Sequence, residues 1–198
     1  MTEVIKDMNN LLTSMENSCN SKEKNGLSIY SLLRSFQKFF ILNQQNYKVD
    51  EIHKTTLLIL GVAGEAGEVL SILKIKDKTD KDTHNLGLEL CDVLAYLAIL
   101  AYDEKFTFAN IYNGFPENLN LDLSENVFNL CELYKKSILF NIDIDPEKFF
   151  EISVNIIQSI FLIAVENDID LFKSMFFCCE KNMKRVIKNT LQTQERND

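Results

Sequence analysis

The sequence has little glycine and little proline, with 6 and 2 residues respectively in a chain of 198. Because these two residues shape most tight turns, their scarcity argues against a β-sheet protein with many turns. It also argues against a Pro/Gly-rich disordered chain. The length suits a single domain spanning residues 1–198, and we expect an all-α fold.

Positive charge is also scarce. Lys and Arg number 21 against 29 Asp and Glu, which gives a formal net charge of −8. A protein that binds nucleic acid through its phosphates normally carries the opposite sign. We therefore expect no nucleic-acid partner.

The sequence shows neither a signal-peptide pattern nor a long run of apolar residues. Charged residues interrupt residues 1–10. The longest apolar stretches, near 57–63 and 156–165, fall short of the roughly 18 to 20 residues that cross a bilayer. The 5 cysteines form no C-x-x-C pair, which suits reduced thiols. We therefore expect a cytoplasmic protein without a membrane partner.

Apolar residues recur at intervals of three and four along most of the chain, which is typical of amphipathic helices. The charged segment 74–84 is expected to be a solvated loop, and the helix that follows it is apolar enough to lie at the centre of a helical bundle. The predicted helices span 3–16, 27–42, 50–73, 86–105, a short stretch from Thr107 to Gly114, 125–140, 146–167 and 171–190.

The two halves of the chain resemble each other at an offset of 63 to 64 residues. At this offset Thr107, a predicted helix N-cap, falls on Asp170, and the helix and loop before each cap also align. We interpret the pattern as a tandem duplication, with a first repeat at 27–116 and a second at 121–190.

Four acidic residues stand out by their spacing and surroundings. Glu65 and Glu68 lie three residues apart, as do Glu89 and Asp92, so each pair shares one face of a helix. Such a pair is common on a solvated face, but these two lie in the most apolar helices. Four carboxylates gathered there would repel one another unless a divalent cation neutralises them. Oxygen-only ligands favour Mg²⁺, with Mn²⁺ as a substitute.

Two glycines, Gly64 and Gly67, accompany these acids in the middle of a helix. A glycine there costs roughly 1 kcal/mol relative to alanine. Either something approaches the backbone closely at this point, or neighbouring helices pack tightly against it.

The segment LGVAGEAGEV at 60–69, followed by Lys74 and by ELCDVLAYLA at 89–98, resembles the MazG-like all-α nucleoside triphosphate pyrophosphohydrolases. Their pattern is E-x-x-E, a spacer, and E-x-x-D, and the resemblance covers about residues 36–116. It implies a Mg²⁺-dependent helical bundle that splits a dUTP-like, dCTP-like or modified nucleoside triphosphate into a monophosphate and pyrophosphate. The implied catalytic and metal-binding residues are Glu65, Glu68, Glu89 and Asp92.

The resemblance also implies substrate-binding residues. Lys74, assisted by Lys76, stands where the family has a lysine that meets the phosphates, although a solvated charged run explains both equally well. Tyr96 matches a family tyrosine that either lines the base pocket or packs. Asn110 matches a family asparagine, but the lysine expected three residues later is Asn113.

The second repeat has lost most of the acids. Family members of one-repeat length usually pair their helices across a dimer. A degenerate copy in the same chain would supply that partner itself, so we expect a monomeric pseudo-dimer with one active site, or a homodimer. The aligned residues are Asn129 for Glu65, Glu132 for Glu68, Ile152 for Glu89 and Asn155 for Asp92.

Two other functions fit the sequence. A non-catalytic nucleotide-binding or sequestering protein would use the same pocket and release no product. A helical interaction protein would carry the acids as surface charge only. Mg²⁺ would then leave thermal unfolding unchanged, whereas a metal site formed only in the folded state raises the midpoint.

Overall fold

The computed structural model describes residues 2–20, 26–44, 51–113 and 119–194, and within these ranges every regular element is a helix. The predicted all-α fold class is confirmed. The predicted boundary at residue 116 lies outside the described residues. The helices are α1 (Thr2–Asn20), α2 (Gly26–Gln44), α3 (Glu51–Leu73), α4 (Asp80–Asp103), α5 (Phe108–Tyr112), α6 (Leu123–Phe140), α7 (Pro146–Glu166) and α8 (Leu171–Gln194).

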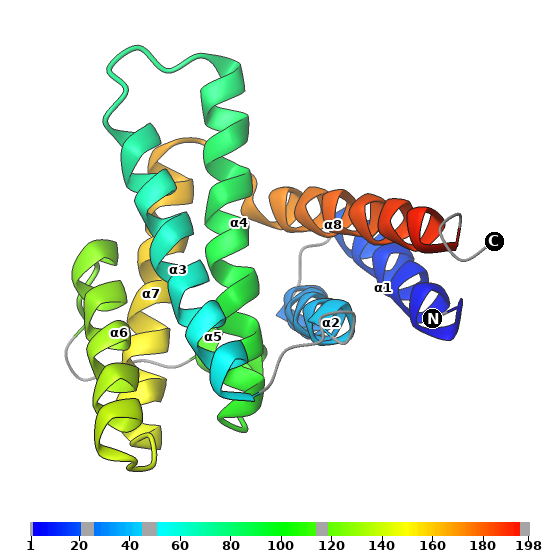
Figure 1. Cartoon of the computed structure of the whole chain (residues 1–198). Coiled ribbons are helices and arrows are strands. Elements are labelled where there is room, and N and C mark those ends of the chain that lie inside the picture. Colours follow the sequence, from blue (N-terminus) through cyan, green and yellow to red (C-terminus); the bar gives the residue numbers. More distant parts are fainter. Residues whose placement is uncertain (1, 21–25, 45–50, 114–118, 195–198) are drawn as a thin grey trace.

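The helices form a bundle with a second layer on one side. α3, α4, α6 and α7 lie side by side, and α1, α2 and α8 gather on the opposite side of α4 (Figure 1). α3 and α4 form an antiparallel hairpin, and α6 and α7 form a second one that packs against α3. α4 contacts α2, α3, α7 and α8, and Leu90, Leu94 and Leu97 are fully buried. The expectation that this helix lies at the centre is confirmed.

α4 begins earlier than the sequence analysis predicted. Thr79 is its N-cap: the hydroxyl accepts a hydrogen bond from the amide of Asp82 (3.3 Å), and the Asp82 carboxylate accepts one from the amide of Thr79 (2.9 Å). This reciprocal pair is a capping box, and it starts the helix inside the charged segment. The predicted loop over 74–84 is therefore wrong for 80–84.

The C-terminal ends of α4 and α7 are built alike. Lys105 and Asp168, 63 residues apart, both adopt a positive φ, of 68° and 54°. Each left-handed residue forms part of a Schellman motif, in which the next amide donates to the carbonyl five positions earlier. These bonds join Phe106 to Ala101 (2.7 Å) and Ile169 to Ala164 (2.8 Å).

The helices that follow these ends are capped at the same offset. Thr107 accepts from the amide of Asn110 (3.2 Å), and Asp170 accepts from the amide of Lys173 (3.2 Å). Helix end, turn and cap therefore repeat in three dimensions at the offset of 63 seen in the sequence. The C-terminal end of α6 has the same motif, with Asn141 at a φ of 50° and the amide of Ile142 donating to Ser137 (3.1 Å), so the likeness is not specific to this offset and the tandem duplication stays a prediction.

Three helices are long and apolar enough to cross a membrane by length and composition: His53–Leu73, Asp80–Asp103 and Pro146–Glu166. This corrects the expectation that no segment reaches that length, which considered only uninterrupted apolar stretches. The buried share of the most apolar window is 67% in α4, 50% in α7 and 28% in α3. Most of that window in α4 is thus buried inside the protein, and the cytoplasmic location stays a prediction.

Candidate functional site

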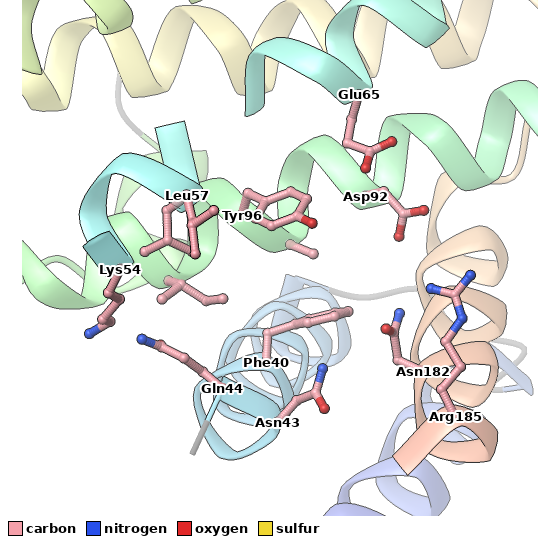
Figure 2. A pocket seen from close by; sticks show the side chains of 13 residues that line it. Phe40, Asn43, Gln44, Lys54, Leu57, Glu65, Asp92, Tyr96, Asn182 and Arg185 are labelled. Atoms are coloured by element: carbon pink, nitrogen blue, oxygen red, sulfur yellow. The ribbon is translucent and has the colours of Figure 1, made fainter. Parts of the chain in front are cut away.

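The α3–α4 hairpin brings three acidic side chains together. Glu65 of α3 and Glu89 and Asp92 of α4 each place a carboxylate oxygen within 4.8 Å of the others. Glu65 and Asp92 lie side by side in Figure 2. All three side chains are partly buried. We call this set the acidic triad.

Glu68, the fourth predicted ligand, does not join the acidic triad. It is exposed, on the next turn of α3. Its charge nevertheless acts on the site, because it contributes to raising the pKa of both Glu65 and Glu89. Glu68 thus lies beside the triad without sharing its centre.

The triad carboxylates disturb one another's protonation. Burial, followed by the charge of Asp92 and a hydrogen bond with Glu89, raises the pKa of Glu65 from 4.5 to about 7. Burial and the Asp92 charge also raise the pKa of Glu89. Desolvation and like charge both disfavour the ionised forms, so the acids compete for a compensating positive charge.

Part of that positive charge comes from α8. Lys181 Nζ lies 2.5 Å from Asp92 Oδ2, and Cys178 Sγ donates a hydrogen bond to Asp92 Oδ1 (3.0 Å). Burial alone would lower the pKa of Lys181, but the hydrogen bond to Asp92 and the charge of Asp92 together outweigh it, and the net pKa is raised. Lys181 is not among the site residues predicted from the sequence. Its only signal is a lysine directly beside the buried stripe of α8 that includes Cys178 and Met183.

A cavity of about 320 Å³ opens beside the triad where α2, α3, α4 and α8 meet. Its walls combine aromatic, carboxamide, aliphatic and cationic side chains, and Figure 2 shows Asn182 and Arg185 reaching from α8 toward the side that holds Asp92. The lining residues are Phe40, Asn43, Gln44, Lys54, Leu57, Leu58, Glu65, Asp92, Ala95, Tyr96, Ile99, Asn182 and Arg185.

Tyr96 both lines this cavity and packs against α3. A Cβ atom added to Gly61 would lie 2.6 Å from the Tyr96 ring, far inside normal contact distance. The missing side chain of Gly61 therefore makes room for the ring. The two alternatives considered for Tyr96, a pocket wall and a packing residue, are combined in one side chain.

Gly64 and Gly67 are exposed, and an added Cβ at either would meet nothing within 4 Å among the described residues. Tight helix packing within the described part of the chain therefore does not account for them. The other explanation remains, in which a ligand or partner approaches the open backbone beside Glu65.

The other predicted substrate-binding residues lie away from the cavity. From Glu65 the cavity extends toward the N-terminal end of α3, whereas Lys74 and Lys76 are exposed beyond its C-terminal end. Asn110 is exposed on α5 and does not line the cavity. Asn113 donates to the hydroxyl of Tyr30 and to the Ala109 carbonyl. Two cations of α8 lie at the site instead: Lys181 pairs with Asp92, and Arg185 lines the cavity.

Two of the four second-half residues that align with the acids have local partners. The Glu132 carboxylate pairs with Lys135, one turn on. Asn155 is buried, and its Oδ1 accepts from the amide of Asn120 (3.3 Å). These bonds lie within the α6–α7 hairpin and the segment that leads into it.

Comparison with protein-family models, with curated proteins and with solved structures finds no match to this chain. The resemblance to the MazG-like family therefore rests on the sequence motifs alone and stays a prediction.

Proposed function

We propose that the chain hydrolyses a nucleoside triphosphate to a nucleoside monophosphate and pyrophosphate in a Mg²⁺-dependent reaction. One observation carries the proposal: three carboxylates converge within 4.8 Å at the edge of a cavity of about 320 Å³ with aromatic and cationic walls. A cavity of this size falls at the lower end of the range of small-molecule sites, about 300 to 1,000 Å³.

The triad fits a hard divalent cation. Its donors are carboxylate oxygens only, which Mg²⁺ and Mn²⁺ prefer over softer metals. Glu65, Glu89 and Asp92 are the residues that would hold the ion. When bound, it would neutralise phosphate charge and lower the pKa of an attacking water.

Glu68 is the acid that we assign to that water. It lies outside the triad but close enough for its charge to affect Glu65 and Glu89. A carboxylate that does not hold the cation remains able to accept a proton from the water while the water oxygen attacks a phosphorus of the nucleotide. The bond from that phosphorus to the leaving oxygen breaks, and pyrophosphate departs.

The cavity walls suit the rest of a nucleotide. Arg185 lines the cavity, and its planar guanidinium group offers several hydrogen-bond donors at once. We therefore assign it to the phosphate oxygens. Phe40 and Tyr96 provide aromatic surface for a base. Asn43 and Gln44 provide carboxamides, which both donate and accept hydrogen bonds at a base edge.

The test is a panel of nucleoside triphosphates with Mg²⁺, including dUTP, dCTP and modified bases, with the products identified by chromatography. We expect a monophosphate and pyrophosphate from at least one nucleotide, and loss of turnover in Glu65→Gln and Glu89→Gln. Glu132→Gln, in the second half, is the matched control. No pyrophosphate from any nucleotide would contradict the proposal.

The same experiment separates the alternative functions. Tight nucleotide binding without any product would favour a sequestering protein. If Mg²⁺ changes neither nucleotide binding nor the midpoint of thermal unfolding, the acids are surface charge and a helical interaction protein is favoured.

A further inference from the structure

Both carboxylate oxygens of Asp92 are bonded to side chains of α8. Oδ2 pairs with Lys181 Nζ at 2.5 Å, and Oδ1 accepts from Cys178 Sγ at 3.0 Å. The side chains of Asp92 and Lys181 are only 16% and 28% exposed. An ion pair so shielded from water is stronger than the usual surface pair, because solvent screens it less.

This arrangement conflicts with metal binding. One oxygen of Asp92 already lies within 4.8 Å of an oxygen of Glu65 and of Glu89, where a divalent cation would bind, while the same carboxylate pairs with Lys181. An ammonium group on the same carboxylate would repel that cation at short range, where like charges interact most strongly. The ammonium and the cation therefore compete for Asp92.

We propose that Lys181 is a displaceable internal cation. It neutralises Asp92 while the triad holds no metal, releases Asp92 when Mg²⁺ binds, and then contacts the phosphate oxygens of the nucleotide beside Arg185. The phosphate step rests on the proposed function, whereas the competition for Asp92 requires only that the triad binds a divalent cation.

The position of Lys181 on α8 supports the second half of this exchange. Lys181 and Arg185 are four residues apart and share one helix face. Arg185 lines the cavity, and the lysine stem has four flexible carbons that let its ammonium move between neighbouring anions. By contrast Lys184 is 70% exposed and pairs with Glu180 on the same helix.

The test compares Lys181→Met with Lys184→Met, which removes the same charge from an exposed site on the same helix. Mn²⁺ binding is measured without nucleotide, from the concentration of free Mn²⁺ given by electron paramagnetic resonance. We expect Lys181→Met to bind Mn²⁺ about tenfold more tightly than the unmodified chain, and Lys184→Met to bind it equally well.

Lys181→Gln keeps a hydrogen-bond donor for Asp92 while removing the charge, and should tighten Mn²⁺ binding in the same direction. This variant replaces Lys181→Met in the test if Lys181→Met does not unfold cooperatively. Unchanged or weaker Mn²⁺ binding in a cooperatively folded Lys181 variant would overturn the competition, because a purely structural ion pair predicts that result.

The phosphate step has its own measurement. At saturating Mg²⁺, Lys181→Met should raise the KM for the nucleotide about tenfold and change kcat less. An unchanged KM would overturn this step.

The two proposals fail in different ways. Tighter Mn²⁺ binding by Lys181→Met with no hydrolysis of any nucleotide supports the competition and contradicts the proposed function. Hydrolysis of a nucleotide by the unmodified chain, with no change of Mn²⁺ affinity in Lys181→Met, supports the proposed function and contradicts the competition. If neither the unmodified chain nor the variants bind Mn²⁺, both proposals fall.

Discussion

The ring of Tyr96 lies over the bare backbone of Gly61, and an added Cβ there would come within 2.6 Å of a ring carbon. Gly61→Ala must therefore push the ring out of its place in the cavity wall. We expect a loss of about 1 to 3 kcal/mol in the free energy of unfolding, as for other overpacked sites. We also expect weaker nucleotide binding, measured by calorimetry beside urea unfolding. Unaltered stability and binding would show that Tyr96 adjusts freely.

Gly64→Ala provides the contrast on the same helix. Apart from its two chain neighbours and the nearby backbone of α3, no described residue has an atom within 4 Å of the added Cβ, so the metal-free protein should gain about 0.5 to 1 kcal/mol from the better helix former. If a nucleotide approaches the backbone here, the same variant should bind it less tightly. Greater stability together with unchanged nucleotide affinity would mean that Gly64 has no role in binding.

The acidic triad could be predicted from sequence because its geometry is mostly local. A spacing of three keeps Glu89 and Asp92 on one face of α4, and a short loop makes α3 its antiparallel neighbour. What spacing does not determine is how each helix is rotated. Val62, Ala66 and Val69 turn α3 so that Glu65 is partly buried at the triad while Glu68, about 60° around the axis, faces solvent.

The contribution of α8 was beyond sequence reasoning. Lys181 and Asp92 are 89 residues apart, and only the packing of α8 on α4 joins them. Helical periodicity says which face of α8 is buried but not which helix covers it. The start of α4, by contrast, was readable: Thr79 followed three residues later by Asp82 fits a capping box, in which Asp replaces the usual Glu or Gln.

Because we assign Glu89 to the cation and Glu68 to the attacking water, we expect variants of the two residues to behave differently. Glu89→Gln removes a triad oxygen without touching the Lys181 pair, so Mn²⁺ affinity should fall at least about tenfold. Glu68→Gln should leave Mn²⁺ affinity within about twofold and lower kcat by about 10² or more, the usual contribution of a general base. Metal titration and steady-state kinetics separate the two. A Glu68 variant that loses metal would place Glu68 among the ligands.

The pKa of Glu65 predicts how stability depends on pH in the metal-free protein. Because this pKa is raised from 4.5 to about 7, the folded state holds a proton that the unfolded state has released between these values. The stabilisation is therefore fully present below pH 4.5 and is lost as the pH rises through 7. Full burial would make the loss about 3 kcal/mol, and partial exposure of Glu65 reduces our expectation to about 1 kcal/mol.

Urea unfolding between pH 5 and 8 without metal measures this loss, and Glu65→Gln should make the profile flatter. Mg²⁺ should raise the unfolding midpoint more at pH 8 than at pH 5.5, because the ion binds only the deprotonated carboxylates. A Mg²⁺ effect that is equal at both values would indicate that Glu65 is not a ligand.

The packing of the second half predicts the oligomeric state. The α6–α7 hairpin lies against α3, and the Tyr134 hydroxyl of α6 donates to Glu104 just beyond α4 (3.1 Å). If this hairpin replaces the partner of a dimer, light scattering should give the mass of one chain, 22.9 kDa, at concentrations where the protein is active. Tyr134→Phe leaves the partly buried Glu104 without this donor and should cost about 1 kcal/mol. A dimer that persists on dilution and loses activity only when it dissociates would show that the second half does not substitute for a partner chain.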